Sequence, residues 1–522
     1  MAAEPVWSVD PRTGKPREQV AVEAGAEDVD RAVRAAHGVR ESLADRAVRA
    51  AFLRTAADLL DGARERIVET ADAETALGPV RLTGELARTT AQLRSFAEVV
   101  EEGSFLDIRI DAPDPGATPP RPDMRRWKIP LGVVAVYAAS NFPLAFSVPG
   151  GDTASALAAG CPVVVKAHPD HPATSELCAS LLRGAAAKSG LPEDVVGLVH
   201  GFDAGVALVR HPLVAAAGFT GSVRGGRALF DAAAARPVPI PFHGELGSLN
   251  PVVLTTAAVA ERAEELGAGL AGSMTLGQGQ FCTKPGFVLA PTGEAGDRFV
   301  DALGAGLSAT GPGVMLDRRM RDAFVAGVTE RAALAGVGTP VAPGAGDAHT
   351  VSAGVLAVDA ALLAEGDRHD LLLEECFGPV TVVARYSSRT EITEVLSRLP
   401  GNLTATLHIA TEATGATEAT ETAEATEATG ATEAGGDADA ASLLAELTPL
   451  AGRVLVNGWP TGVAVAPAQH HGGPYPATTS TATSVGATAI ERWLRPFTYQ
   501  STPDHLLPPE LRDGNPLGLP RR

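Results

Sequence analysis

Short runs of β-branched residues that alternate with helical stretches are the feature that most constrains the fold of this chain. Strand-like runs occupy residues 131–138 (LGVVAVYA), 161–167 (CPVVVKA) and 214–221 (VAAAGFTG), with small-residue or amphipathic segments between them. Residues 251–400 continue the alternation, and residues 28–101 read as several consecutive helices. Strands that alternate with helices form a parallel sheet covered on both faces. The predicted fold class is therefore α/β.

Length and charge narrow the class of protein. The 522 residues exceed the usual size of one domain, so two or more domains are expected. Apolar residues make up 45% of the chain, which is typical of a globular protein rather than a disordered one. A net charge of −19 argues against nucleic acid or an anionic membrane as a partner. No apolar run approaches the ~18 residues of a membrane span, and a cytoplasmic location is expected.

The cysteines differ in their surroundings. The chain has four and no CxxC pair, so neither a zinc knuckle nor a secreted disulfide framework is expected. Cys161, Cys178 and Cys376 read as buried small hydrophobes. Cys282 instead lies in GQGQFCTKPG, where flanking glycines let the backbone approach a substrate and leave N–H groups available to stabilise charge. Cys282 is the candidate nucleophile.

A nucleophilic cysteine needs a base and a donor for the developing oxyanion. Glu245, in the Gly-flanked HGELGSLNP, offers a carboxylate, and Asn141, in SNFP just after a predicted strand, offers an amide. Spacing alone leaves a second interpretation open, in which the three residues are a buried thiol, a surface carboxylate and a turn asparagine.

Three further motifs were weighed as binding sites. In GFTGSVRGG a strand-like run is followed by Gly221 and Ser222 and then a predicted helix, whose N-terminal N–H groups suit a pyrophosphate; an ordinary turn is the alternative. GAGLAG, residues 267–272, matches GxGxxG but follows a helical segment, so we reject it as a nucleotide motif. His470 and His471 lie in a Gly/Pro loop without neighbouring ligands, and no metal site is expected.

Residues 411–440 stand apart from the rest of the chain. They form a near-repeat of Thr, Glu, Ala and Gly with eight acidic residues and no basic ones. Because the repeat has no apolar face, we expect a solvated, unstructured insertion, although Ala and Glu allow transient helix.

Two sets of motifs are distributed along nearly the whole chain. The first set is ASNFPLAFSVPGG, FTGS, GELGSLNP, GQFCTKPG, EECFGPV and NGWPTGV, and the second is VVVKAHPDHPATSE, PIPFHGELGSLNPV, HHGGPYPATTSTATSVGATAIERWLRPFTYQ and LLPPELRDGNPLGL. The first set occurs in the order seen in the aldehyde dehydrogenase superfamily, which the chain resembles. The fold implied is the aldehyde dehydrogenase fold, with a Rossmann-like cofactor domain, an α/β catalytic domain and an oligomerisation arm. The second set resembles the NADP-dependent branch that includes 2,5-dioxopentanoate (α-ketoglutarate semialdehyde) dehydrogenases.

The resemblance assigns roles to the catalytic candidates. Cys282 is the nucleophile, Glu245 the general base and Asn141 the oxyanion donor. A thiolate adds to the aldehyde, hydride leaves for the nicotinamide, and the remaining thioester is hydrolysed by water that Glu245 activates. The product is the carboxylic acid, and the expected reaction converts 2,5-dioxopentanoate to 2-oxoglutarate.

The resemblance also implies the cofactor, NADP, with NAD possible. Glutamate stands three residues after the motif lysine in many NAD-preferring relatives, whereas this chain has Pro169, which removes a charge that would repel a 2′-phosphate. The carboxylate of the EECFGPV motif is expected to reach the nicotinamide ribose. The cofactor-binding residues implied are Lys166, Gly221, Ser222, Arg224, Glu375 and Phe377.

One residue departs from the family pattern. Relatives usually carry Asn two residues after the cysteine, and this chain has Lys284. A nearby ammonium lowers a thiol pKa, but a lysine that points to solvent is the alternative.

The family architecture implies three parts and a homodimer or homotetramer. The cofactor-binding domain would comprise residues 1–107 and 131–243, the catalytic domain residues 244–480, and the oligomerisation arm residues 108–130 with 481–522. Three alternatives remain: oxidation of another aliphatic or aromatic aldehyde, a CoA-acylating dehydrogenase, and an inactive structural homologue. The last two are disfavoured, because Glu245 and the other catalytic candidates are all present.

Overall fold

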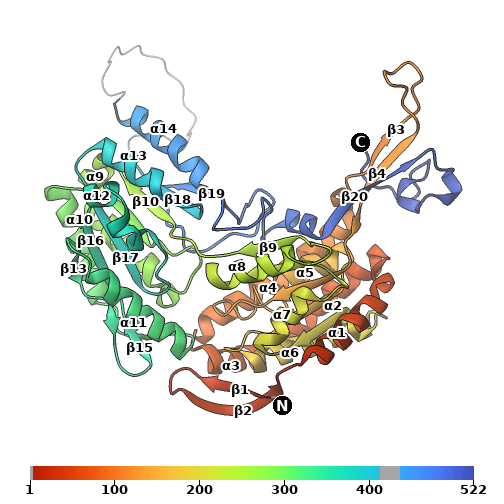
Figure 1. Cartoon of the computed structure of the whole chain (residues 1–522), viewed down its shortest axis with the longest axis horizontal. Helices are drawn as coiled ribbons and strands as arrows, with labels where there is room; N and C mark the ends of the chain where they lie inside the picture. The colour runs from red at the N-terminus through yellow and green to blue at the C-terminus, as the bar shows by residue number, and fades with distance from the viewer. Residues whose placement is uncertain (1–3, 412–434) are drawn as a thin grey trace, which may run out of the picture. The chain divides into compact units, whose positions relative to one another are not determined.

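The computed structural model describes residues 4–411 and 435–522, and the chain forms two compact units (Figure 1). Unit 1 comprises residues 1–246, 464–470 and 479–522, and unit 2 comprises residues 247–463 and 471–478. The predicted arm segments, 108–130 and 481–522, both belong to unit 1. The functional names given above to the parts of the chain stay predictions.

Unit 1 is built on a five-stranded sheet in which every neighbouring pair is parallel, as the alternation of strands and helices predicted. The carboxyl ends of these strands therefore share one edge, which is where open α/β sheets bind their ligands. In spatial order the strands are β7 (Val196–Val199), β6 (Val163–Lys166), β5 (Val133–Tyr137), β8 (Val214–Thr220) and β9 (Phe242–Glu245).

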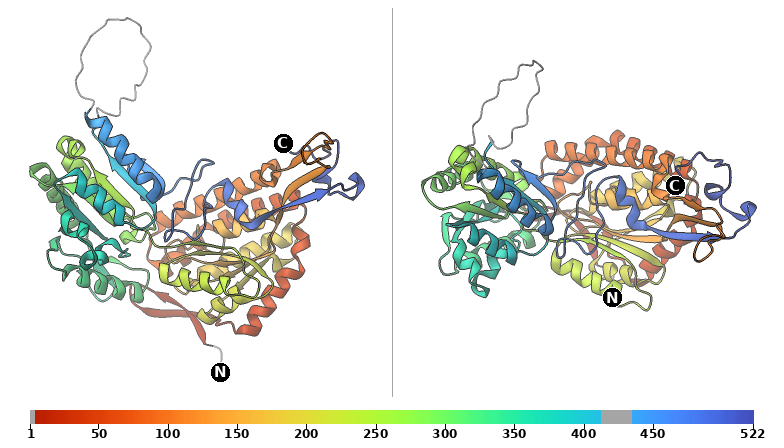
Figure 2. Two further views of the ribbon diagram at one scale, coloured as in Figure 1. Left: turned by 45° about the horizontal axis from the view of Figure 1, so that its top comes forward. Right: turned by 90° about the horizontal axis from the view of Figure 1, so that it is seen from above.

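Helices cover both faces of this sheet (Figure 1 and Figure 2). Successive side chains of a strand point to opposite faces, so Val134 and Val136 of β5 pack in one apolar cluster and Val133, Ala135 and Tyr137 in another. The first cluster includes residues of α2 (Arg46–Gly62), α4 (Pro79–Glu102), α5 (Gly151–Ala159) and α6 (Pro172–Lys188), and the second includes residues of α1 (Ala26–Gly38), α7 (Phe202–Arg210) and α8 (Val223–Ala234).

The predicted helical region 28–101 is confirmed, since α1, α2, α3 (Arg64–Thr75) and α4 occupy it. Two smaller sheets complete unit 1. The β1–β2 hairpin (Pro5–Asp10 and Lys15–Val22) is drawn in red in Figure 1. The other sheet is antiparallel and joins β3 (Arg109–Asp111), β4 (Met124–Pro130) and β20 (Leu494–Gln500).

Unit 2 is built on a seven-stranded sheet, parallel except at one edge, where β13 runs antiparallel to its neighbour. The order is β13 (Gly338–Val341), β16 (Gly354–Asp359), β17 (Val380–Tyr386), β11 (Phe287–Pro291), β10 (Pro251–Leu254), β18 (Asn402–His408) and β19 (Ala451–Val456). A small antiparallel sheet contains β12 (Gly313–Val314), β14 (Gly344–Ala345) and β15 (Thr350–Ser352).

Two helical layers flank this second sheet. Phe287 and Leu289 of β11 pack in one apolar cluster, and Val288 and Ala290 pack in the other. α9 (Thr256–Thr275) and α10 (Glu294–Ser308) contribute to the second cluster, and α11 (Arg318–Ala332), α12 (Ala360–Ala364), α13 (Arg389–Arg398) and α14 (Gly435–Leu447) contribute to the first. GAGLAG lies inside α9, which confirms its rejection as a nucleotide turn.

The acidic insertion was predicted to be unstructured over residues 411–440. Residues 412–434 lie outside the described part of the chain. Residues 435–440 differ from the expectation, because they begin α14, whose later residues Leu443 and Leu447 are buried in the apolar cluster of unit 2. Burial of these leucines stabilises a helix that the repeat itself does not signal. Within the described ranges, no helix is long and apolar enough to cross a membrane.

Candidate active site

The loop that carries Cys282 links α9 to β11 in unit 2. The backbone turns through Gly277, Gln278 and Gly279, all with positive φ, in a 3₁₀ turn (Leu276–Gly279). Glycine adopts this conformation without steric cost, which explains the Gly-rich sequence before the cysteine. Among residues 281–286, Cys282 alone is half-buried, and the other five are buried. The fold therefore presents this thiol and covers its neighbours.

Two buried asparagines stabilise the loop that carries Cys282. Asn250, with a φ of 54°, donates from Nδ2 to the carbonyl oxygens of Cys282 (2.8 Å) and Lys284 (2.9 Å). Asn402 Oδ1 in turn accepts the backbone N–H groups of Leu249 (2.9 Å) and Asn250 (3.0 Å). Satisfied buried polar networks of this kind rigidify the structure around them.

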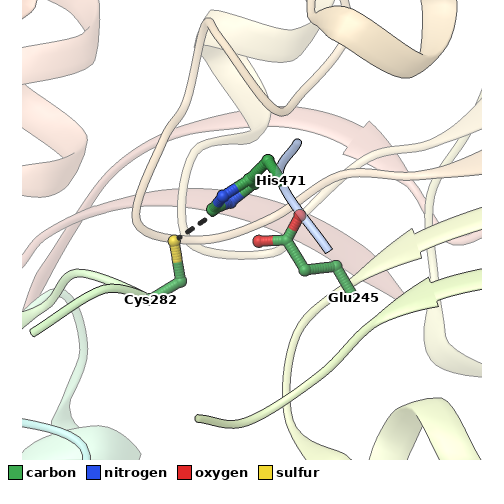
Figure 3. A group of neighbouring side chains, drawn as sticks. All are labelled: Glu245, Cys282 and His471. Atoms are coloured by element: carbon green, nitrogen blue, oxygen red, sulfur yellow. Dashed lines mark hydrogen bonds between the residues drawn. The ribbon is translucent and has the colours of Figure 1, made fainter. Parts of the chain in front are cut away.

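His471 is the residue that the sequence reasoning missed. Its Nε2 lies 3.7 Å from the Cys282 Sγ, and its side chain is 1% exposed (Figure 3). The expectation that the histidine pair lacks neighbouring ligands is wrong for His471, because a loop 189 residues away in sequence brings the thiol to it. A neighbouring imidazole can take the thiol proton and leave the nucleophilic thiolate.

The other three cysteines lack such a setting. Cys161 and Cys178 are buried, as predicted, and burial raises their pKa to about 11 and about 12. Cys376 is half-buried rather than fully buried, and burial raises its pKa as well. Since the thiolate is the reactive form, these three thiols are poor nucleophiles.

Lys284 contradicts one of the two sequence interpretations, and the other, that its ammonium lowers the thiol pKa, stays a prediction. The side chain does not point to solvent, since only 2% of it is exposed, and its ammonium donates to the carbonyl oxygens of Cys376 (3.1 Å) and Val380 (2.7 Å). Its described contacts thus run to the segment after Glu375.

Glu245 is the last residue of β9 in unit 1 and is 3% exposed. Its Oε2 accepts a hydrogen bond from Ser484 Oγ at 2.7 Å. Its own carbonyl oxygen accepts the N–H of Gly221 at 3.0 Å, which joins the end of β9 to the glycine turn after β8. The carboxylate therefore has a fixed orientation at the carboxyl edge of the sheet.

Asn141 follows β5 at the same edge of the sheet, in the loop before α5. Asn141 is 8% exposed, and its backbone carbonyl oxygen accepts a 2.5 Å hydrogen bond from Arg81 Nη2. Arg81 belongs to α4, so the first helical layer fixes this loop.

The strand–turn–helix predicted around Gly221 is confirmed. β8 ends at Thr220, Ser222 caps α8 by accepting the Gly225 N–H at 3.2 Å, and the turn is exposed, as is Arg224. A Cβ on Gly221 would lie 2.7 Å from the Phe219 ring, so a side chain does not fit there. An exposed glycine turn at the N-terminus of a helix suits a phosphate.

Lys166 is the final residue of β6 and is half-buried, with its Nζ 5.8 Å from the centre of the Phe202 ring. Pro169 is exposed in a turn beyond the strand. Register pairs Tyr137 with both Lys166 and Phe219, so these positions share the edge that carries Gly221.

Glu375 and Phe377 lie in unit 2, between a 3₁₀ turn (Asp367–Leu373) and β17, and both are half-buried. Burial raises the pKa of the Glu375 carboxyl to about 7, although the Lys284 ammonium opposes that shift. The half-buried position and this pKa distinguish Glu375 from an ordinary surface acid, and its role at the nicotinamide ribose stays a prediction.

Comparison with known proteins gives the family. The model for "Aldehyde dehydrogenase family" matches residues 2–438. The chain belongs to the aldehyde dehydrogenase family. It is 46% identical to alpha-ketoglutaric semialdehyde dehydrogenase 2 of Azospirillum brasilense, over 98% of this chain and 94% of the relative. It is 40% identical to alpha-ketoglutaric semialdehyde dehydrogenase of Acinetobacter baylyi, over 99% of this chain and 95% of the relative.

Solved structures agree on the fold. Glyceraldehyde-3-phosphate dehydrogenase of Methanocaldococcus jannaschii, complexed with NADP, matches with a TM-score of 0.77 at 17% identity, over 96% of this chain and 99% of that one. Gamma-glutamyl-gamma-aminobutyraldehyde dehydrogenase of Burkholderia cenocepacia also gives 0.77, at 20% identity, over 96% and 94%. The predicted aldehyde dehydrogenase fold is confirmed, and so is the predicted class of enzyme, an aldehyde dehydrogenase that uses NAD(P).

Proposed function

We propose that this protein oxidises 2,5-dioxopentanoate (α-ketoglutaric semialdehyde) to 2-oxoglutarate with NADP. The main observation is that the half-buried Cys282 thiol lies 3.7 Å from His471 Nε2 in a family member 46% identical to an alpha-ketoglutaric semialdehyde dehydrogenase over nearly its full length. The resemblance of the branch motifs supports the same substrate.

In the first chemical step, Cys282 attacks the aldehyde carbonyl. His471 Nε2, at 3.7 Å from the sulfur, is suited to receive the thiol proton. The Asn141 amide and the Cys282 backbone N–H are proposed to stabilise the oxyanion that forms as the C–S bond is made. Collapse of the thiohemiacetal then releases a hydride and leaves a thioester on Cys282.

Hydrolysis of the thioester is assigned to Glu245. Its carboxylate abstracts a proton from water, which attacks the acyl carbon and displaces the Cys282 thiolate. The Ser484 hydroxyl at 2.7 Å holds the carboxylate in one orientation without replacing it as the proton acceptor. A carboxylate base distinguishes this route from acyl transfer to coenzyme A.

The residues of unit 1 fit a dinucleotide. An exposed Gly-Ser turn at the start of α8 suits a diphosphate, and Lys166 and Arg224 offer cations for a 2′-phosphate that no carboxylate at Pro169 repels. Glu375 and Phe377 are proposed to hold the nicotinamide ribose. Bound NADP would supply the hydride acceptor, and NAD remains the alternative.

The oligomeric state and the functions of the parts of the chain belong to the same proposal. We assign cofactor binding to residues 1–107 and 131–243, catalysis to 244–480, and oligomerisation to 108–130 with 481–522. A cytoplasmic homodimer or homotetramer is proposed. The antiparallel β3–β4–β20 sheet supports the arm, because it joins both proposed arm segments.

A panel of aldehydes tests the substrate. Purified protein is supplied with 2,5-dioxopentanoate, succinic semialdehyde, an uncharged aliphatic aldehyde and benzaldehyde, and cofactor reduction is followed with NADP and with NAD. The proposal predicts the highest kcat/KM for 2,5-dioxopentanoate with NADP. A higher value for another aldehyde would replace the substrate while leaving the chemistry in place.

A further inference from the structure

Lys284 is a buried cation whose described hydrogen bonds go to carbonyl oxygens. It follows Cys282 by two residues, is 2% exposed, and donates to Cys376 O (3.1 Å) and Val380 O (2.7 Å). Removing an ammonium from water is costly, and burial lowers the pKa of Lys284, while Cys376 and Glu375 oppose that shift. A protein that only needed to fill this space would do so more cheaply with an apolar side chain.

The two bonds connect two functional segments. Lys284 belongs to the loop of Cys282, and the carbonyls that it binds flank Phe377 and follow Glu375. The backbones also meet closely, since a Cβ on Gly279 would lie 2.4 Å from Gly378 O. The Cys282 loop and residues 375–380 are therefore packed against each other, with the ammonium as the cross-link.

The charges around Glu375 come from several elements. The Lys284 ammonium of the Cys282 loop interacts electrostatically with the Glu375 carboxyl. Arg331 of α11 donates to the carbonyl oxygens of Glu374 (3.2 Å) and Glu375 (3.5 Å). The neighbouring Cys376 thiol and a backbone N–H of Ser248 complete this environment. Burial raises the pKa of Glu375 to about 7, and Lys284 and the Ser248 N–H lower it.

We propose that Lys284 is a positioning residue that fixes residues 375–380 against the Cys282 loop and keeps Glu375 oriented and ionised as the acceptor for the cofactor ribose hydroxyls. The inference rests on the proposed function, because Glu375 is there assigned to the ribose. In this role Lys284 acts through Glu375.

Direct binding of the cofactor tests the role without turnover. The dissociation constant of NADP⁺ is measured by calorimetry from pH 6 to pH 9 for wild type, Lys284→Met, Glu375→Gln and the double variant. Lys284→Gln keeps N–H donors without the charge, and Lys188→Met removes an exposed lysine at the end of α6 as a control. NAD⁺ is run in parallel, because the 2′-phosphate of NADP⁺ itself titrates near pH 6.

In wild type, binding should tighten as Glu375 ionises on raising the pH through about 7. Lys284→Met should weaken NADP⁺ binding about tenfold at pH 7 and move this transition to higher pH, since loss of a neighbouring cation raises a carboxyl pKa. Lys284→Gln should show the same upward movement. In the Glu375→Gln background, Lys284→Met should change binding by less than about twofold, and Lys188→Met should behave as wild type.

Five results would overturn the inference or its basis. An unmoved transition in Lys284→Met, or the same weakening in the Glu375→Gln background, would reduce Lys284 to a structural role. If Lys284→Met does not fold, Lys284→Gln replaces it in this test. An unmoved pH transition of NADP⁺ binding in Lys284→Gln would then reduce Lys284 to a structural role. A changed rate of Cys282 alkylation at fixed pH, with NADP⁺ binding intact, would show that Lys284 acts on the thiol. Unweakened NADP⁺ binding by Glu375→Gln alone would refute the cofactor assignment in the proposed function instead.

Discussion

Replacing His471 should slow the reaction of Cys282 at neutral pH and leave the fold intact. His471→Phe keeps a buried aromatic ring of similar size but removes the nitrogen that lies 3.7 Å from the Cys282 sulfur. The side chain is 1% exposed, so an aromatic replacement preserves packing better than alanine would. The variant therefore isolates the loss of the proton acceptor.

The size of the effect follows from the ionisation of a thiol. A thiol with the ordinary pKa of ~8.5 is only ~3% ionised at pH 7. If the imidazole supplies a fully formed thiolate, its removal lowers the reactive population up to ~30-fold at pH 7. The deficit should shrink to less than about twofold at pH 9, where an ordinary thiol is largely ionised without help.

Alkylation by iodoacetamide measures the thiolate directly, without substrate or cofactor. The labelling is selective because burial raises the pKa of Cys161, Cys178 and Cys376. The rate is followed from pH 6 to pH 9 by intact mass, with His470→Phe as the matched control. Wild type and the control should react rapidly over the whole range, and His471→Phe only at high pH.

Equal alkylation rates for wild type and His471→Phe at pH 7 would refute the role given to His471. The initial burst of cofactor reduction provides a second reading, since it requires attack by the same sulfur. A slowed burst with unchanged alkylation would place His471 in substrate binding rather than in activation of the thiol.

Four further predictions follow from other parts of the chain. Glu245→Gln should slow thioester hydrolysis more than hydride release, leaving a rapid burst of about one reduced cofactor per site, and normal steady turnover would contradict this. Pro169→Glu should lower the NADP-to-NAD ratio of kcat/KM about 5- to 10-fold (~1 to 1.4 kcal/mol), whereas an unaltered ratio would remove Pro169 from cofactor selection. A short Gly/Ser linker in place of residues 412–434 should leave melting temperature and kcat nearly unchanged, since each doubling of loop length costs only ~0.6 kcal/mol, and loss of folding would show that the segment is structural. Gly226→Ala should destabilise unit 1 by ~1–3 kcal/mol, because the new Cβ would lie 2.0 Å from a leucine carbon, while Gly62→Ala, which meets open space, serves as the control in denaturant unfolding.

Local patterns predicted the elements of the fold well. The β-branched runs became β5 and β6, because strands buried on both faces select such residues whatever their partners, and the alanine-rich run at 214–221 became β8. The glycines before Cys282 marked a loop, and three consecutive positive φ values there show why. The acidic repeat was different: α14 begins at Gly435, and the buried leucines that follow stabilise it through tertiary packing.

Contacts between distant residues lay beyond the sequence. His471 contacts Cys282, which lies 189 positions away in the sequence, and the local sequence HHGG does not indicate a thiol partner. In the sequence Lys284 stands out only as a departure from a family pattern, and its burial depends on the carbonyls of Cys376 and Val380, which lie 92 and 96 positions away. The roles of Cys282, Glu245 and Asn141 stay predictions until the variants are measured.

The two asparagines that stabilise the Cys282 loop affect how the pH dependence of the rate is interpreted. Asn250 and Asn402 hold the loop with amide groups that neither gain nor lose a proton between pH 5 and pH 9. The scaffold under Cys282 therefore keeps its geometry while the groups around it titrate. A bell-shaped dependence of rate on pH in this enzyme can accordingly be assigned to side chains that titrate, Lys284 and Glu375 among them, and not to a loosening of the two asparagines.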